Sequence, residues 1–284
     1  MKCHSILLTL LFLISFLMPV CAQTSGVDTS KIGHSDLVGK YVSMRGFKMY
    51  YEAYGKGEPV LMIHGNGGDI SNMLYQIPYF AQHYHVIVAD SRDQGKSADP
   101  TDSISYEMMA DDLNGLLEYL SIDSAYVIGW SDGGIEGLLL AMRHPDKVKK
   151  LAITGANLWP DSTAVDPWVV SSTAEYCQSL MKQPQTPELK HQIKLIKLCV
   201  FEPHITTKQL AQIKCPTLVI GGDHDVILPQ HTMLIAQSIP KSYLWILPNS
   251  GHSTPIVYHD EFNRVIGEFF MKPYRKIEEL GRFN

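Results

Sequence analysis

Six short apolar runs place the strongest constraint on what this chain can fold into. They span residues 59–63, 85–89, 125–128, 151–153, 216–220 and 243–247. Runs this short and this apolar are typical of parallel strands whose two faces are both covered by helices. The segment 41–54 differs, because bulky and polar residues alternate on both sides of Gly46, which predicts an antiparallel hairpin that opens the sheet.

Apolar residues at helical spacing separate the predicted strands. One set lies at positions 109, 113, 116, 117 and 120, and a second at 135, 138, 139 and 142. Such alternation predicts an α/β fold with a mostly parallel, doubly wound sheet. Over residues 157–214 the alternation lapses into amphipathic helices, so we expect a small helical cap inserted after the strand that ends near Gly155. Strands and helices then resume, up to a helix over 261–271.

The N-terminal residues predict a secretory leader. Lys2 gives a positive start, residues 6–20 are apolar, and the small residue Ala22 marks a cleavage point. We therefore expect a signal peptide over residues 1–22 and one domain over residues 23–284, exported to the periplasm or the medium. The apolar run is shorter than the ~20 residues of a spanning helix, so no stable membrane insertion is expected after the leader is removed.

Charge and cysteine usage exclude several classes of function. Loss of Lys2 with the leader takes the net charge from −5 to −6, which argues against nucleic acid as a partner. Three cysteines remain, and either Cys177 pairs with Cys199 or all three, Cys215 included, are free thiols, which we favour. The histidines lack metal-ligand spacing, so we expect no metal and no cofactor. Nothing in the sequence indicates an oligomeric state.

One serine lies where a predicted strand should turn into a helix. Residues 129–133 read G-W-S-D-G, directly after the apolar run that ends at residue 128. Glycines two before and two after Ser131 are typical of a nucleophile elbow, in which strand and helix approach closely and the hydroxyl stands clear of the sheet. A plain strand-to-helix turn is the alternative. The two readings differ in whether the chain also supplies a base and an acid.

Candidate partners follow two later strands. Asp225 comes just after the run 216–220, and His252 just after the run 243–247. Parallel sheets place their sites at these strand ends, and nucleophilic attack by a hydroxyl needs a base that a carboxylate orients. We expect Ser131, His252 and Asp225 to form a catalytic triad. Asp223 is the rival acid, which we expect to shape the turn, and His224 is the rival base, which we expect to be solvated.

Attack on a carbonyl also needs donors for the negative charge that builds on oxygen. We expect one donor to be the backbone amide of Asp132, directly after the serine. The second should come from the glycine-rich segment 64–68, where the backbone amide of Asn66 is the best candidate. His64 is expected to pack and to form hydrogen bonds rather than to catalyse. A flexible connection without function is the alternative interpretation of this segment.

These motifs, in this order, resemble those of the serine α/β-hydrolases over the whole mature length. The landmarks are His64-Gly65, the segment 90–97, the elbow, the segment 222–225 and Gly251-His252. One departure is Asp93, which stands where glycine is common in that family. The resemblance implies an α/β-hydrolase fold, no cofactor and a small ester-like substrate.

The chain is most similar to the biphenyl-hydrolase-like group, which includes valacyclovir hydrolase. Segments 129–135, 155–157 and 260–263 carry this likeness. It implies that the Asp132 carboxylate holds the α-amino group of a substrate, and it makes Asn157 a candidate for substrate contact. The alternative is that Asp132 contributes only its amide and a favourable charge at a helix start. Trp159 and Trp168 could line an apolar pocket or could simply pack the cap onto the core.

The expected reaction is hydrolysis of a carboxylic ester through an acyl-enzyme. A carbon–carbon bond hydrolase, a lactonase or a perhydrolase could use the same groups, and a noncatalytic binding protein could retain the fold. The pair Asp111-Asp112 invites an acid–base interpretation. We reject it because the pair is expected on the polar side of an amphipathic helix.

Overall fold

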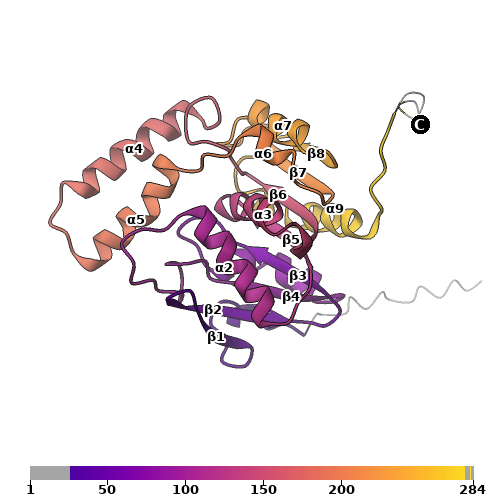
Figure 1. Ribbon diagram of the computed structural model, residues 1–284, viewed down its shortest axis with the longest axis horizontal. Coiled ribbons are helices and arrows are strands. Elements are labelled where there is room, and N and C mark those ends of the chain that lie inside the picture. Colours follow the sequence, from indigo (N-terminus) through magenta and orange to yellow (C-terminus); the bar gives the residue numbers. More distant parts are fainter. Residues whose placement is uncertain (1–25, 279–281, 283–284) are drawn as a thin grey trace, which may run out of the picture.

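The computed structural model describes residues 26–278 and 282. Within them the strands form one eight-stranded sheet (Figure 1). Its strands are β1 (Gly39–Met44), β2 (Phe47–Tyr54), β3 (Glu58–Ile63), β4 (Tyr84–Ala89), β5 (Ala125–Trp130), β6 (Val148–Thr154), β7 (Thr217–Gly222) and β8 (Ser242–Leu247). They lie in the order β1-β2-β4-β3-β5-β6-β7-β8. The pairs β1–β2 and β2–β4 are antiparallel, and all later pairs in this order are parallel. The predicted hairpin and the mostly parallel sheet are confirmed. The expected leader lies outside the described residues.

Helices cover both faces of this sheet, as the apolar strands require. In chain order the α-helices of the described residues are α1 (Gln76–Phe80), α2 (Tyr106–Tyr119), α3 (Asp132–Arg143), α4 (Pro167–Met181), α5 (Pro187–Phe201), α6 (Thr207–Leu210), α7 (Pro229–Ser238), α8 (Thr254–Val257) and α9 (His259–Met271). Alternate residues of β3 enter separate cores. Leu61 packs on the side of α2, α3 and α7, and Met62 on the side of α1 and α9. None of the helices in the described range combines the length and the apolar character that crossing a membrane requires.

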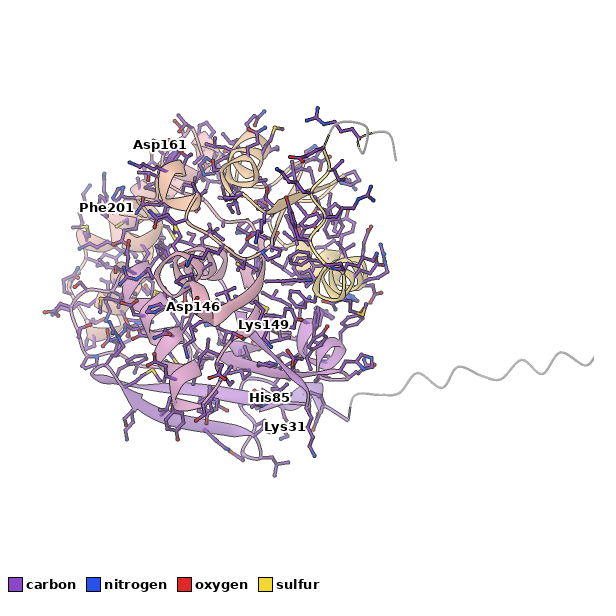
Figure 2. All side chains as sticks on the ribbon, turned by 45° about the vertical axis from the view of Figure 1, so that its right-hand side comes forward. Lys31, His85, Asp146, Lys149, Asp161 and Phe201 are labelled. Carbon is purple, nitrogen blue, oxygen red and sulfur yellow. The ribbon has the colours of Figure 1, made fainter. Side chains whose placement is uncertain are left out.

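The helices α4 and α5 lie between β6 and β7, where a cap was expected, and project beyond the sheet (Figure 1). Side chains of Asp166 and Thr186 accept hydrogen bonds from the first backbone amides of α4 and α5 and so fix their starts. Figure 2 places Asp161 and Phe201 at the surface of this end of the molecule, away from Lys31 and His85. Three of the fifteen residues of α5 are buried, namely Ile193, Leu195 and Leu198, and the last two belong to the core around α2 and α3.

The expectation that Asp111 and Asp112 both face solvent is wrong for Asp112. Its carboxylate is buried and accepts hydrogen bonds of 2.6 and 2.8 Å from Nε and Nη2 of Arg92, which is buried as well. Arg92 lies in the loop after β4, twenty residues earlier. Helical periodicity cannot reveal such a partner, and a buried carboxylate is tolerated only when it is paired.

Candidate active site

The backbone at Ser131 has the strained geometry that the glycine spacing predicts. Ser131 joins β5 to α3 with φ 58° and ψ −119°, a region that residues with side chains seldom occupy. A Cβ atom on Gly129 would lie 2.2 Å from the carbonyl oxygen of Gly133, and one on Gly133 would lie 2.2 Å from that of Ile63. Only glycine therefore lets β5, α3 and β3 approach closely enough to form this turn.

The structure brings together the three residues that we expected to form a triad. Nε2 of His252 lies 2.9 Å from Oγ of Ser131, and Nδ1 of His252 lies 2.7 Å from Oδ1 of Asp225. Each follows the carboxyl end of a strand, β5 for the serine, β7 for the aspartate and β8 for the histidine. This is the arrangement in which an imidazole can accept the proton of a hydroxyl.

Neighbouring groups fix the imidazole in place. The indole N–H of Trp130 donates to the carbonyl oxygen of His252 at 2.9 Å. Gly155, with φ 67°, leaves room for the ring, because a Cβ atom there would lie 2.7 Å from Cε1 of His252. Asp225 is buried, and its Oδ1 also accepts the backbone N–H of Ile227 at 3.1 Å. The carboxylate is thereby held toward the ring.

The rival acid and base lie elsewhere. The His224 side chain is 76% exposed and contacts Asp223 rather than the serine. Oδ1 of Asp223 accepts the backbone N–H of Ser250 at 3.0 Å, so this carboxylate ties the loop after β7 to the loop that carries His252. These positions agree with a solvated His224 and a turn-shaping Asp223.

The carboxylate of Asp132 is buried beside the nucleophile, and the two side chains that donate hydrogen bonds to it are neutral. Nδ2 of Asn66 donates to its Oδ2 at 2.7 Å, and the hydroxyl of Tyr106 forms a second hydrogen bond. Burial raises the pKa of Asp132 to about 6, and the two hydrogen bonds partly oppose that rise. Tyr106 was not a sequence candidate, because the first residue of a helix carries no local signal for a contact with a distant loop.

The glycine-rich loop 64–68 passes next to Ser131. A Cβ atom on Gly65 would lie 3.1 Å from Cβ of Ser131. His64 is buried, donates through Nδ1 to the carbonyl oxygen of Gly65 at 2.7 Å and accepts the Ser91 N–H through Nε2 at 3.0 Å, and burial lowers its pKa. This pattern fits a neutral imidazole with a structural role. Asp132 begins α3, where backbone amides have no partner within the helix.

A cavity of about 270 Å³ opens beside Ser131, Asp132 and His252. Its wall consists mostly of apolar side chains from the segment before α4, from α4 and α5 and from the loop after β7, namely Val165, Val169, Val170, Ala174, Ile196, Val200, Val226 and Ile227. Among the residues that line it, Asp132 and Glu202 are acidic and none is a lysine or an arginine. The cavity suits an apolar group that carries a positive charge close to the nucleophile.

Of the other candidates for substrate contact, Asn157 lines this cavity and Trp159 does not. The Trp159 ring packs edge-on against His231, with ring centres 4.7 Å apart, and its indole N–H donates to Thr163 at 2.8 Å. Trp168 is 74% exposed. Trp159 turns away because its N–H finds a partner within the cap.

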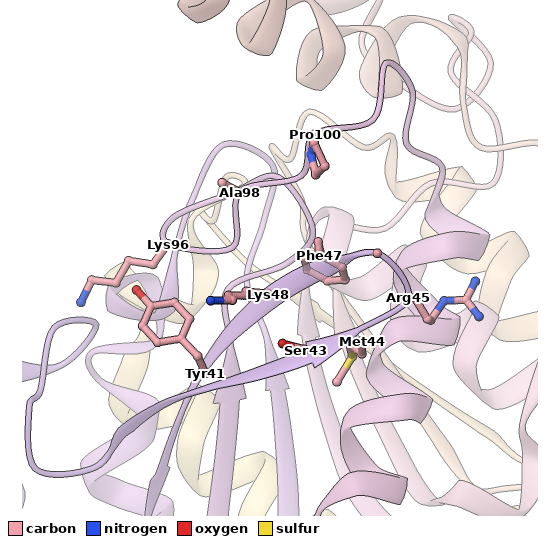
Figure 3. A pocket seen from close by; sticks show the side chains of 10 residues that line it. Tyr41, Ser43, Met44, Arg45, Phe47, Lys48, Lys96, Ala98 and Pro100 are labelled. Atoms are coloured by element: carbon pink, nitrogen blue, oxygen red, sulfur yellow. The ribbon is translucent and has the colours of Figure 1, made fainter.

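A larger open cavity, of about 710 Å³, lies over the β1–β2 hairpin. Figure 3 shows Tyr41 and Phe47 from the hairpin, and Lys96 and Pro100 from the loop after β4, around it. None of the residues that line it belongs to the cluster around Ser131. Size alone therefore does not identify the site in this molecule.

The described part of the chain shows neither a cross-linked cysteine pair nor a metal cluster. Cys177, Cys199 and Cys215 are free thiols, and Cys199 lines the cavity, where burial raises the pKa of its thiol. Within residues 26–278 and 282, no three histidine, cysteine or acidic side chains gather closely enough to hold a metal ion.

Comparisons with known proteins agree with this geometry. Residues 58–190 match the family described as the alpha/beta hydrolase fold. Serine hydrolase BPHL of Mus musculus is 27% identical over 248 residues, which cover 80% of this chain and 84% of that protein. Putative carbamate hydrolase RutD of Serratia proteamaculans (strain 568) is 27% identical over 264 residues, 79% of this chain and 96% of that one.

Solved structures show the same architecture. The enol-lactonase from Burkholderia xenovorans LB400 superposes with a TM-score of 0.68 at 21% sequence identity, over 82% of this chain and 100% of that chain. At this identity the likeness concerns the fold alone. The family match and the solved structures show that the chain has the α/β-hydrolase fold. The relatives, which are named as hydrolases, support that it is an enzyme.

Proposed function

We propose that this α/β hydrolase cleaves carboxylic esters through a covalent acyl-enzyme formed on Ser131. The observation that carries this proposal is the chain of short hydrogen bonds from Ser131 through His252 to the buried Asp225, built on a strained elbow. A structure without a catalytic task has little reason to hold a serine in so unfavourable a backbone region.

In the proposed mechanism, His252 takes the proton of the Ser131 hydroxyl as its Oγ attacks the ester carbonyl carbon. Asp225 holds Nδ1–H of the imidazole and stabilises the imidazolium that forms. The backbone amides of Asp132 and Asn66 receive the oxyanion. His252 then protonates the departing alcohol, and a water molecule activated by the same imidazole releases the acid and restores Ser131.

We also propose that the preferred substrates carry an α-amino group. A carboxylate beside the nucleophile whose hydrogen-bond donors are both neutral can accept an ammonium at the distance of an α-substituent. The apolar side chains of the cap suit the rest of such a substrate. The resemblance to the biphenyl-hydrolase-like group, which includes valacyclovir hydrolase, supports the same assignment for Asp132.

Labelling with a fluorophosphonate tests the reaction class, because this reagent modifies serines that are activated by a base. We expect covalent labelling of the purified protein at Ser131, none in Ser131→Ala, and a loss of ester hydrolysis of at least about 1,000-fold in His252→Ala. Circular dichroism of both variants controls for folding. A folded wild-type chain that is never labelled at Ser131 and cleaves none of a panel of esters, lactones and aminoacyl esters contradicts the proposal.

A further inference from the structure

The departure from the family pattern at Asp93 is accompanied by contacts that a glycine could not make. Asp93 lies in the loop after β4 with φ 60°, a region that favours glycine, and it is nevertheless buried. Its Oδ1 accepts the backbone N–H of Asp99 at 3.1 Å. Its Oδ2 lies 2.8 Å from Nζ of Lys194 and 3.0 Å from Nδ1 of His191. Both of these partners belong to α5 of the cap.

The Lys194 ammonium is fully occupied by this one loop. Its side chain is only 11% exposed. Besides Asp93, Nζ donates to the carbonyl oxygens of Asp99 at 3.1 Å and of Thr101 at 2.6 Å. An ammonium with three acceptors at short distance is well compensated for its burial. The loop after β4 and the middle of α5 are therefore held together by a charged, mostly buried contact.

Leu195, the residue after Lys194, connects α5 to the side chains beside the nucleophile. The carbonyl oxygen of Leu195 accepts a hydrogen bond of 3.2 Å from Nδ2 of Asn66, and the same Nδ2 donates to Asp132 at 2.7 Å. Beyond it on α5, Ile196 and Val200 line the cavity beside Ser131. The position of α5 thus determines where the cap side of the cavity wall lies and in which direction the side-chain amide of Asn66 points.

We propose that Asp93 is a positioning residue whose ion pair with Lys194 holds α5 over the cavity and, through the Leu195 carbonyl, aims Asn66 at Asp132. Asp93 then determines how tightly the enzyme binds substrates that contact the cap and the Asp132 carboxylate. It touches neither the triad nor the reacting atoms. The kinetic part of this inference rests on the proposed ester hydrolysis, whereas the structural part does not.

Two variants remove this contact from opposite sides. Asp93→Gly suits the positive φ and deletes the carboxylate, and Lys194→Met keeps most of the side-chain length and deletes the charge. Lys190→Met is the matched control, because Lys190 is an exposed lysine one turn earlier on the same helix. The double variant Asp93→Gly/Lys194→Met completes a double-mutant cycle. None of the four changes alters a member of the triad.

Steady-state kinetics on two benzyl esters distinguish a positioning role of Asp93 from a structural defect that would lower activity on both substrates alike. For L-valine benzyl ester, which offers an ammonium and a branched side chain, we expect KM to rise about tenfold in each single variant with kcat changed less than about twofold. For benzyl acetate, which lacks the ammonium and the branched acyl side chain, both constants should stay close to wild type. Lys190→Met should match wild type with both esters. The double variant should resemble the single variants, because either change alone already breaks the pair.

Hydrogen exchange followed by mass spectrometry tests the same contact without any substrate. Backbone amides over residues 193–199 should exchange at least about tenfold faster in Asp93→Gly and Lys194→Met, while amides of β3 and β5 keep wild-type protection. Unchanged exchange in α5, additive effects in the double variant, or equal losses with both esters overturn the proposal. Absence of ester hydrolysis in the wild type contradicts the proposed function instead, and the exchange measurement then decides about Asp93.

Discussion

At the scale of single residues, Asp132 combines two features that oppose each other. It begins α3, where the helix dipole favours a negative charge, and it is only 4% exposed, which favours the neutral acid. Burial prevails and raises its pKa to about 6. The carboxylate beside the nucleophile therefore changes its charge within a pH range in which the folded protein can be assayed.

The proposed preference for α-amino esters should accordingly depend on pH. The raised pKa means that Asp132 is mostly protonated at pH 5 and mostly ionised at pH 7, and only the ionised form attracts an ammonium. We expect the ratio of kcat/KM for L-valine benzyl ester to that for benzyl 3-methylbutanoate to rise severalfold from pH 5 to pH 6.5. The ratio cancels pH effects that act on both esters alike, and the substrate amine stays largely protonated over this range.

Two variants serve as controls for this prediction. Asp132→Asn keeps the size of the side chain and should lower the ratio about tenfold at pH 6.5 while removing its pH dependence. Glu202→Gln changes the other acid of the cavity and should retain both the wild-type ratio and its pH dependence. A ratio near one in the wild type, or a ratio that Asp132→Asn leaves intact, would remove the ammonium assignment and leave ester hydrolysis standing.

At the scale of elements, the site depends on how closely α3 can approach the ends of β5 and β3. A methyl group on Gly133 would lie 2.2 Å from the carbonyl oxygen of Ile63 and 2.7 Å from that of His64. Because both oxygens are backbone atoms, they cannot move away without shifting the loop 64–68 that carries Asn66. The distance between helix and strand therefore controls the nucleophile and its proposed oxyanion donors together.

A pair of glycine substitutions tests this dependence. Gly133→Ala should lower the free energy of unfolding by about 1–3 kcal/mol and reduce ester hydrolysis at least about 100-fold. Gly115→Ala is the matched change on α2, where the new methyl group would meet only Sδ of Met44 at 3.6 Å. It should raise stability by about 0.5–1 kcal/mol and leave activity unchanged. Urea unfolding measures the stability of each variant, and kcat on one ester measures its activity. A Gly133→Ala variant that is as active and as stable as wild type contradicts the argument.

The elements themselves were largely predictable, because the central parallel strands are apolar on both faces and the hairpin strands β1 and β2 alternate bulky and polar residues. The expectation that Ser131, Asp225 and His252 meet followed from their places after β5, β7 and β8. Contacts between segments distant in the chain were not predictable in this way. Tyr106 on Asp132 is one example, and another is Trp159, for which the sequence left two alternatives and which packs against His231 of α7 instead of lining the cavity. Such contacts depend on where a loop or a cap lies, which no local pattern encodes.

At the scale of the whole molecule, helices on both faces remove the sheet centre from water, and several acids are buried with it. Glu136 on α3 is fully buried, and its carboxyl group lies 3.3 Å from the hydroxyl oxygen of Ser91. Burial holds the pKa of Glu136 well above its usual range, and the negative charge of Asp132 adds to this effect. The folded protein therefore keeps a proton on Glu136 that the unfolded chain releases.

This difference makes stability depend on pH with a definite sign. In the unfolded chain Glu136 ionises near its ordinary pKa of about 4.3, so as pH rises above that value ionisation lowers the free energy of the unfolded state but not that of the folded state. Stability is consequently lost with rising pH until the folded pKa is reached.

Glu136→Gln mimics the protonated acid, keeps an acceptor for Ser91 and removes this loss of stability. Its Tm should match wild type near pH 4.5 and exceed it by several degrees at pH 8, since 1 kcal/mol corresponds to about 2–4 °C in a domain of this size. Glu175→Gln, a change at an exposed position of α4, should shift Tm little at either pH. A Tm difference between Glu136→Gln and wild type that stays constant from pH 4.5 to pH 8 in differential scanning calorimetry would show that Glu136 is ionised in the folded protein.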